Sequence, residues 1–188
     1  MADVSSFNDY FKAEKKSQLK ESVAKKTARP NIKTEKFIHK SDDLAGLIKS
    51  SKKPVMLLFE QGSCLECDEL HGNVFRRLPV FKQLKQFTIA QVDITSDKKI
   101  IGPKGQSVTQ KELATMLDVQ YTPSMLFYEA GSDKVVFRSD AYLKTFHVQA
   151  LFDYVLTQEY LKESEFQRFV QRRADRMREE GQEVDLWD

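Results

Sequence analysis

Apolar residues follow two kinds of pattern along the chain. Residues 55–59, V-M-L-L-F, are apolar at every position, which predicts a strand buried on both of its faces. Elsewhere apolar residues recur at spacings of three and four, which is typical of helices with one buried side. Strands are expected at residues 36–39, 55–59, 87–92, 124–128 and 134–138. Helices are expected at residues 41–49, 64–78, 109–117, 143–158 and 160–180.

The order of these elements predicts the class of fold. Strands and helices alternate in the first part of the pattern, which favours parallel pairing of those strands. The last two strands flank a turn at Gly131 and should pair as an antiparallel hairpin. Residues 95–108 contain G-P-K-G-Q and are expected to form a loop. We therefore predict an α/β fold with a small mixed sheet and helices on both faces.

Both ends of the chain are predicted to be helical extensions of this core. Near the start, Phe7, Tyr10 and Phe11 lie on one helical face, and Pro30 ends the pattern because proline disfavours helix in the residue before it. The predicted division is an N-terminal helical arm at 1–31, a domain at 32–158 and a C-terminal helical extension at 159–188.

The C-terminal extension carries an apolar stripe at helical spacing. Its members are Phe166, Phe169, Val170, Ala174 and Met177. We expect this stripe to fold back onto its own domain. Binding of a partner helix, or self-association of the chain through its terminal helices, is the alternative.

Composition and charge limit the classes of partner. The 188 residues include 30 Lys and Arg against 28 Asp and Glu, a net charge of +2, so no broad electrostatic attraction to nucleic acid is expected. No apolar run reaches the roughly 18–20 residues of a membrane span, so no membrane insertion is expected. The polar start M-A-D-V-S-S predicts no signal peptide. These features suit a cytoplasmic protein or a mature secreted domain.

The only two cysteines, Cys64 and Cys67, follow the solid apolar strand directly. A disulfide between them closes too small a loop to stabilise the fold much, so the pair indicates sulfur chemistry or metal binding. His71 lies one turn beyond Cys67 and would supply a third ligand, but a structural zinc site needs four. We therefore expect a packed histidine and no metal, with a zinc site as the alternative.

Two stretches of the chain, of which the first holds both cysteines, resemble one family. They are L-L-F-E-Q-G-S-C-L-E-C-D-E-L-H and L-D-V-Q-Y-T-P-S-M-L-F-Y. A buried strand, C-x-x-C opening the next helix, and Thr-Pro opening a later strand resemble the thioredoxin fold over residues 33–158. The closest likeness is to the bacterial periplasmic thioredoxin-like branch that accompanies sulfur oxidation (SoxW-type). The resemblance implies a central sheet of four to five strands.

The resemblance also implies site residues and a setting. The peptide bond before Pro123 would be cis, and Thr122 and Pro123 would lie beside the cysteines and bind the substrate backbone. The setting would be a bacterial periplasm, with the cytoplasm as the alternative, and an upstream thiol would supply electrons. In the position six before Cys64, where thioredoxins often have a buried acid, this chain has Leu58. Glu60 is the nearest carboxylate in the sequence, and we expect it to be only a weak substitute.

The chemistry of the pair follows from its position on the helix. Cys64 stands at the helix N-terminus, where the dipole favours a thiolate, so we expect it to be the nucleophile. Cys67 would be the resolving thiol that releases the substrate. Acids such as Glu60 and Glu66 crowd the sequence around the pair and disfavour an added anion, so they are candidate modulators of its acidity and favour a reductant.

Two classes of function remain open from the sequence. The first is a thiol–disulfide oxidoreductase that reduces protein or small-molecule disulfides without a further cofactor. The second is a non-catalytic adaptor, in which the disulfide is passive and the end helices bind a partner.

Overall fold

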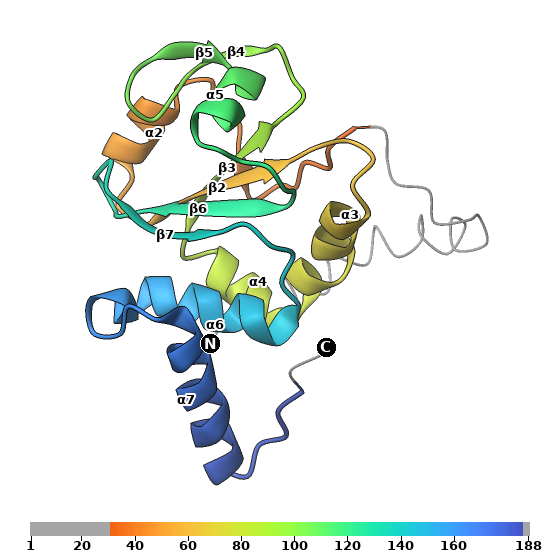
Figure 1. The fold of residues 1–188 in the computed structure, drawn as a ribbon, viewed down its shortest axis with the longest axis vertical. Helices are drawn as coiled ribbons and strands as arrows, with labels where there is room; N and C mark the ends of the chain where they lie inside the picture. Colours follow the sequence, from red (N-terminus) through yellow and green to blue (C-terminus); the bar gives the residue numbers. More distant parts are fainter. Residues whose placement is uncertain (1–30, 186–188) are drawn as a thin grey trace, which may run out of the picture.

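The computed structural model describes residues 31–185, and a five-stranded sheet lies at its centre (Figure 1). The strand order is β1-β3-β2-β6-β7. These strands are β1 (Ile38–His39), β2 (Val55–Glu60), β3 (Thr88–Asp93), β6 (Ser124–Tyr128) and β7 (Val135–Ser139). β1, β3 and β2 run parallel, whereas β6 pairs antiparallel with both β2 and β7. The predicted mixed sheet with its late hairpin is confirmed.

Helices cover both faces of this sheet, as predicted. One face carries α2 (Leu44–Ser50), α5 (Gln110–Met116) and a two-stranded sheet of β4 (Lys99–Ile101) and β5 (Ser107–Thr109). The other face carries α3 (Leu65–Gly72), the 3₁₀ turn η1 (Val74–Arg76), α4 (Leu78–Leu84) and α6 (Thr145–Leu156). Figure 1 shows these two layers above and below the sheet, with α3 at one end of β2.

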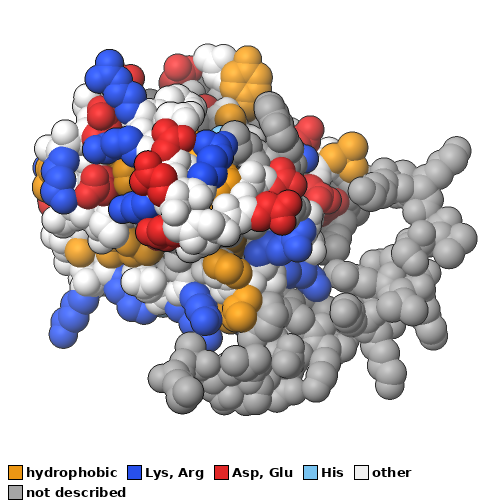
Figure 2. Space-filling view, turned by 90° about the horizontal axis from the view of Figure 1, so that it is seen from below, with side chains coloured by type: hydrophobic (Ala, Val, Ile, Leu, Met, Phe, Trp, Pro, Cys, Tyr) orange, Lys and Arg blue, Asp and Glu red, His pale blue; other side chains and the backbone are white. Residues whose placement is uncertain are grey.

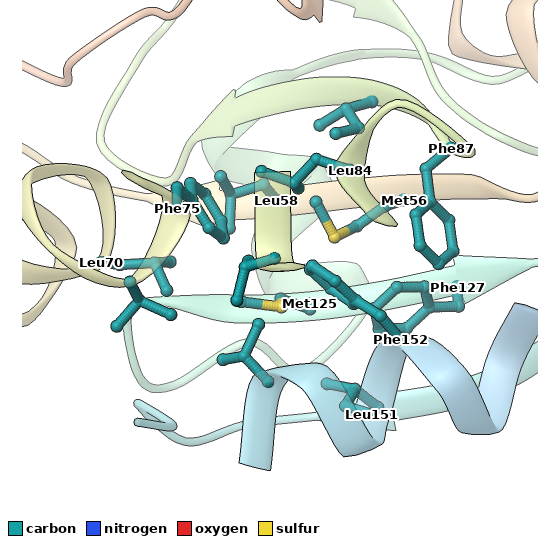
Figure 3. Packing of buried hydrophobic residues seen from close by; sticks show 14 of the residues in the cluster. Met56, Leu58, Leu70, Phe75, Leu84, Phe87, Met125, Phe127, Leu151 and Phe152 are labelled. Atoms are coloured by element: carbon teal, nitrogen blue, oxygen red, sulfur yellow. The ribbon is translucent and has the colours of Figure 1, made fainter. Parts of the chain in front are cut away.

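The central strand β2 explains the solid apolar run in the sequence. All six of its residues are buried. Met56 and Leu58 pack into the core under α3, α4 and α6 (Figure 3), whereas Val55, Leu57 and Phe59 face α2 and α5. Side chains on both faces of β2 pack against apolar neighbours, which explains why every residue of the strand except Glu60, its last, is apolar.

The predicted helix at 64–78 is wrong in its length. α3 ends at Gly72, a 3₁₀ turn follows, and a separate helix, α4, begins at Leu78. Pro79 lies in the first turn of α4, where a missing N–H costs no helical hydrogen bond. The sequence predicts that this proline ends a helix, but it lies in the first turn of the next one.

The predicted loop at 95–108 is also wrong in part. Within it, β4 and β5 pair antiparallel, with Ile100 opposite Val108. Gly105 has φ of 81°, a left-handed conformation that suits glycine, and it turns the chain between the two strands. The strands are only three residues each, too short to show a period in the sequence.

The C-terminal helix α7 (Phe166–Glu179) packs on the outer side of α6. Phe169, Val170 and Ala174 are buried there in one cluster with Tyr154 and Phe146. The prediction that the stripe folds back on its own domain is confirmed. The helix is shorter than expected, because residues Glu159–Leu161 form a separate 3₁₀ turn, η2. The predicted N-terminal helix lies outside the described residues.

Charged side chains of both signs share the surface. Figure 2 shows the molecule from below relative to Figure 1. Lys and Arg side chains (blue) are interspersed there with Asp and Glu (red). Orange apolar side chains appear there singly or in small groups. The described part of this face therefore forms neither an extended apolar patch nor a field of one sign.

Candidate functional site

The candidate site begins where β2 ends. β2 stops at Glu60, and a short turn brings the chain to Cys64, the residue that caps α3. Ser63 in this turn has φ of 58°, which reverses the chain directly before the cysteine. The Cys67 backbone N–H donates to Cys64 Sγ at 3.1 Å. Cys64 thus takes the role that serine or aspartate has at other helix starts, and its sulfur lies at the positive end of the helix.

Cys64 and Cys67 form a disulfide. The sulfur–sulfur distance is 2.09 Å, and the two Cα atoms are 5.3 Å apart. Both residues are largely covered, with 6% of Cys64 and 5% of Cys67 exposed. Leu65, the first residue of α3, is 53% exposed, so its side chain reaches solvent while the two cysteines are covered.

Thr122, which directly precedes Pro123, lies beside Cys64, as the family resemblance implies. β6 pairs antiparallel with β2 and sets Ser124 opposite Phe59, which carries the residues before β6 to the cysteine end of the sheet. The Thr122 hydroxyl donates to Cys64 Sγ at 3.5 Å, and the Thr122 carbonyl oxygen lies 3.6 Å from the same sulfur. The Thr122–Pro123 peptide bond is cis.

On the inner side of the cysteines lies a cluster of buried charged groups. Glu60 and His71 are each 1% exposed. His71 Nε2 donates to both carboxylate oxygens of Glu60 at 3.0 Å, and the Gln91 side-chain amide donates to Glu60 as well. His71 Nδ1 lies 3.4 Å from Glu35, whose carboxylate is 2.9 Å from Lys33 Nζ. We call Lys33, Glu35, Glu60 and His71 the buried ion cluster.

The contacts of the buried ion cluster set its charge state. Burial alone would lower the pKa of His71, but the hydrogen bonds and negative charges of Glu35 and Glu60 outweigh burial and raise it. Burial alone would raise the pKa of Glu35, but His71 and Lys33 lower it to about 2. An imidazolium held between two carboxylates is therefore the state that this geometry favours.

A narrow crevice joins the cluster to the disulfide. It is lined by residues 31–33, Glu60, Gln61, Cys64, Cys67, Asp68 and His71. The segment before β1 therefore closes one wall of the site, opposite α3. Lys33, about thirty residues before the cysteines in the sequence, therefore lines the same crevice as they do.

Sequence reasoning found some of these groups and missed others. The sequence predicts Glu60 to be only a weak substitute for the family's buried acid, yet Glu60 is buried and accepts hydrogen bonds from His71 and Gln91. Glu66 lies on the exposed side of α3 and does not line the crevice. Lys33 and Glu35 were missed altogether, because no local pattern links them to the cysteines.

The structure also bears on the zinc alternative. Nε2 of His71 is directed at Glu60. Among residues 31–185 there is no group of three His, Cys, Asp or Glu side chains that could hold a metal ion. Across the same residues, no helix is both long and apolar enough to cross a membrane.

Comparison with known proteins identifies the family of this domain. Residues 42–156, more than half of the chain, match the thioredoxin-like domain family. The chain belongs to this family. It is 34% identical over 89 residues to the thiol:disulfide interchange protein DsbD of Vibrio vulnificus strain CMCP6, and equally to that of strain YJ016. The match covers 47% of this chain but only 14% and 13% of those much longer relatives.

A solved structure supports the same fold. A thioredoxin-fold protein from Helicobacter pylori superimposes with a TM-score of 0.62, covering 74% of this chain and 92% of that one. Its sequence identity is 15%, so this likeness concerns the fold alone. The expected thioredoxin-like fold is confirmed, whereas the SoxW-type branch stays a prediction.

The buried ion cluster predicts how stability depends on pH. Glu35 stabilises the fold above its unfolded pKa of about 4.5, and this contribution disappears as the pH falls toward about 2. His71 acts in the opposite sense, because its pKa is raised above 6.5: its contribution is complete below pH 6.5 and is lost as the pH rises through the raised pKa. The free energy of unfolding should therefore be largest between about pH 4.5 and 6.5.

Glu35→Gln tests this dependence in urea unfolding at several pH values. We expect the variant to be about 1–3 kcal/mol less stable at pH 6, since it loses charged hydrogen bonds in a buried site. The difference from the unchanged protein should shrink toward pH 2. Glu129→Gln, at the far end of β6, is the control and should follow the unchanged protein. A constant difference at all pH values would contradict the assignment.

Proposed function

We propose that the protein is a thiol–disulfide oxidoreductase that reduces disulfides of proteins or small molecules through Cys64 and Cys67. One observation carries this proposal: the bonded pair lies at the start of α3, and Thr122 contacts Cys64 from the segment before β6. The similarity to a thiol:disulfide interchange protein supports the same chemistry.

In the proposed reaction, the Cys64 thiolate attacks one sulfur of the substrate disulfide. The first substrate thiolate leaves, and Cys64 is bonded to the second substrate sulfur. Cys67 then loses its proton and attacks Cys64 Sγ, which expels the second substrate thiolate. The substrate gains two electrons and two protons, and the pair ends as the disulfide observed here. An upstream thiol donor must then reduce it again.

Thr122 and Pro123 would position the substrate for this attack. The residues before β6 lie against Cys64, so an extended substrate segment can run alongside them and pair with their backbone. Because Cys64 and Cys67 are both buried, a substrate disulfide must dock along this edge to reach Cys64.

The charges around the pair favour reduction of substrates rather than their oxidation. Glu66, Asp68 and Glu69 in α3 disfavour a thiolate at its N-terminus, which destabilises the dithiol form relative to the disulfide. We expect a reduction potential well below the roughly −120 mV of strongly oxidising enzymes. Equilibration with defined thiol–disulfide buffers, followed by trapping of free thiols, measures it. A potential near or above that of the oxidising enzymes would refute this direction.

The activity itself has a direct test. The protein in its dithiol form should reduce insulin with a low-molecular-weight thiol as electron donor. Protein whose thiols were first alkylated is the control and should have no activity. Equal rates with and without alkylation would rule out the proposed reaction.

For the setting, we propose the bacterial periplasm and a role beside sulfur oxidation, as in the SoxW-type branch. The similarity to DsbD supports a role in thiol–disulfide exchange. Fractionation of cells that express the native gene tests the compartment, and recovery in the cytoplasmic fraction would contradict it.

One observation favours a second candidate, a non-catalytic adaptor. Cys64 and Cys67 are only 6% and 5% exposed, which suits a passive disulfide as well as one that reacts only with a docked substrate. An adaptor would keep its disulfide in the presence of a mild thiol and would not reduce insulin, so the same assay separates the two functions.

A further inference from the structure

A hollow lies between α6, η2 and α7, and none of the residues that line it lines the crevice at the disulfide. Its volume is about 500 Å³, and its lining is mostly charged: Asp153, Thr157, Glu159, Phe169, Arg172, Arg173 and Arg176. Figure 1 shows the blue end of α6, which leads into α7, on the far side of the molecule from α3. A space of this size suits a small molecule, because ligand sites typically measure about 300–1,000 Å³.

Most of this hollow lies outside the residues that match the thioredoxin-like family. The match ends at residue 156, and of the lining residues only Asp153 precedes that point. The cysteine chemistry of the family domain therefore does not explain the charged lining. Packing of α7 on α6 does not explain it either, because that contact is made by buried apolar and aromatic side chains.

The two acids of the hollow already have cationic or amide partners. Asp153 accepts hydrogen bonds from Arg173 Nε at 3.1 Å and Arg173 Nη2 at 2.8 Å. The side-chain amide of Gln83 donates to the other carboxylate oxygen of Asp153 at 2.6 Å. Glu159 accepts a hydrogen bond from Lys162 at 2.9 Å. Asp153 and Arg173 thus form a fixed and formally neutral part of the wall, and Lys162 balances the charge of Glu159.

Two arginines of the hollow are left without a hydrogen-bonded anion. Arg172 Nη2 lies 3.9 Å from Glu159, which is too long for a hydrogen bond. The side chain of Arg176 forms no hydrogen bond or ion pair with any other residue among 31–185. Arg172 and Arg176 are four residues apart on α7, so their like charges lie side by side and repel each other. An anion bound between them would relieve this repulsion and add charge-assisted hydrogen bonds.

We propose that this hollow binds a small organic molecule that carries two or more phosphate or carboxylate groups. Arg172 and Arg176 pair with these groups, because a guanidinium can donate two parallel N–H bonds to either oxyanion. Arg172 is 58% exposed, so the ligand can enter from solvent, and the Phe169 ring offers its apolar part a contact. A protein partner fits less well, since a stable interface covers about 800 Å² of each partner. The inference is independent of the proposed function.

Isothermal titration calorimetry of the full chain in its disulfide form tests this site. The probes are pyrophosphate, which carries phosphate groups, and tricarballylate, which carries three carboxylates, both at the same ionic strength. We expect at least one of them to bind once per chain, with a Kd of about 1 mM or tighter at about 0.1 M salt. The probe that binds more tightly shows which oxyanion the hollow prefers. Weaker binding of both probes would overturn the inference.

Arg176→Gln and Arg168→Gln are a matched pair of variants for the same titration. Each removes one exposed positive charge from α7, but only Arg176 lines the hollow. Arg176→Gln should weaken binding at least about fivefold, because a charge-assisted contact is lost. Arg168→Gln should weaken it by less than about twofold, through net charge alone. Equal weakening by both variants would mean that the anion responds only to the charge of the helix, and the proposed site would be wrong.

NMR spectroscopy locates the bound anion in the unchanged protein and decides the question if a variant fails to fold. The anion that binds should shift the backbone amide signals of Thr157, Arg172 and Arg176 most, and should leave those of Leu65 and Thr122 unaltered. Shifts centred on α3 would place the anion at the cysteines and contradict the proposal. Neither measurement uses the thiols, so a failure to reduce insulin leaves this inference standing, and a failure to bind anions leaves the proposed reaction standing.

Discussion

Replacing Cys64 with serine is expected to lower insulin reduction at least about a thousandfold, because a serine hydroxyl is not ionised at neutral pH and cannot attack a disulfide. Replacing Cys67 with serine should also stop turnover, but at a later point. Cys64 then still attacks, and the substrate stays bonded to it since no second thiolate can release it. The two variants control each other, because each retains the cysteine that the other lacks.

Non-reducing electrophoresis after mixing with a disulfide protein distinguishes these outcomes. Cys67→Ser should accumulate a covalent adduct that a strong reductant dissolves, whereas Cys64→Ser should form none. In cell extracts, the same Cys67→Ser adducts would reveal the natural substrates. If Cys64→Ser retained more than a tenth of the original rate, or if Cys67→Ser formed no adduct, the adaptor function would be the better explanation.

The second large effect concerns the core beneath the site. Phe152 on α6 is fully buried, and its ring centroid lies 5.1 Å from that of Phe87 and 6.3 Å from that of Phe127 (Figure 3). Phe152→Ala removes this contact between α6 and the sheet and leaves a cavity, which should cost about 3–5 kcal/mol. Such a loss is a large part of the roughly 5–15 kcal/mol that holds a typical domain folded.

Urea unfolding followed by circular dichroism measures this loss. Leu161→Ala is the control, because Leu161 is 65% exposed and its truncation should change the free energy of unfolding by less than about 0.5 kcal/mol. Equal effects of the two substitutions would show that α6 is not packed on the sheet as described here.

Local patterns were sufficient for the sheet and for the cysteine pair. The apolar run of β2 and the helix start at Cys64 are visible because burial on both faces and helix capping act on adjacent residues. The apolar stripe of α7 could also be predicted from the sequence, since a helix repeats its buried face every turn. Thr122 and Pro123 came from resemblance and not from any local pattern.

Errors arose where the local signal has two meanings. Proline is common both after the end of a helix and in its first turn. Only the structure shows that Pro79 lies in the first turn of α4. The strands β4 and β5 are too short to show alternation, so pairing between them could not be expected from either one alone.

The sequence by itself determined that a pair of cysteines stands at the end of a buried strand and opens a helix in an α/β domain. Only the tertiary structure decided which charges surround that pair. Glu35 reaches His71, and Lys33 pairs with Glu35, because β1 pairs beside β3 and brings the preceding segment to the site. Glu60 gains its partners from α3 and β3. Contacts of this kind depend on distance in space, which the spacing of residues along the chain does not record.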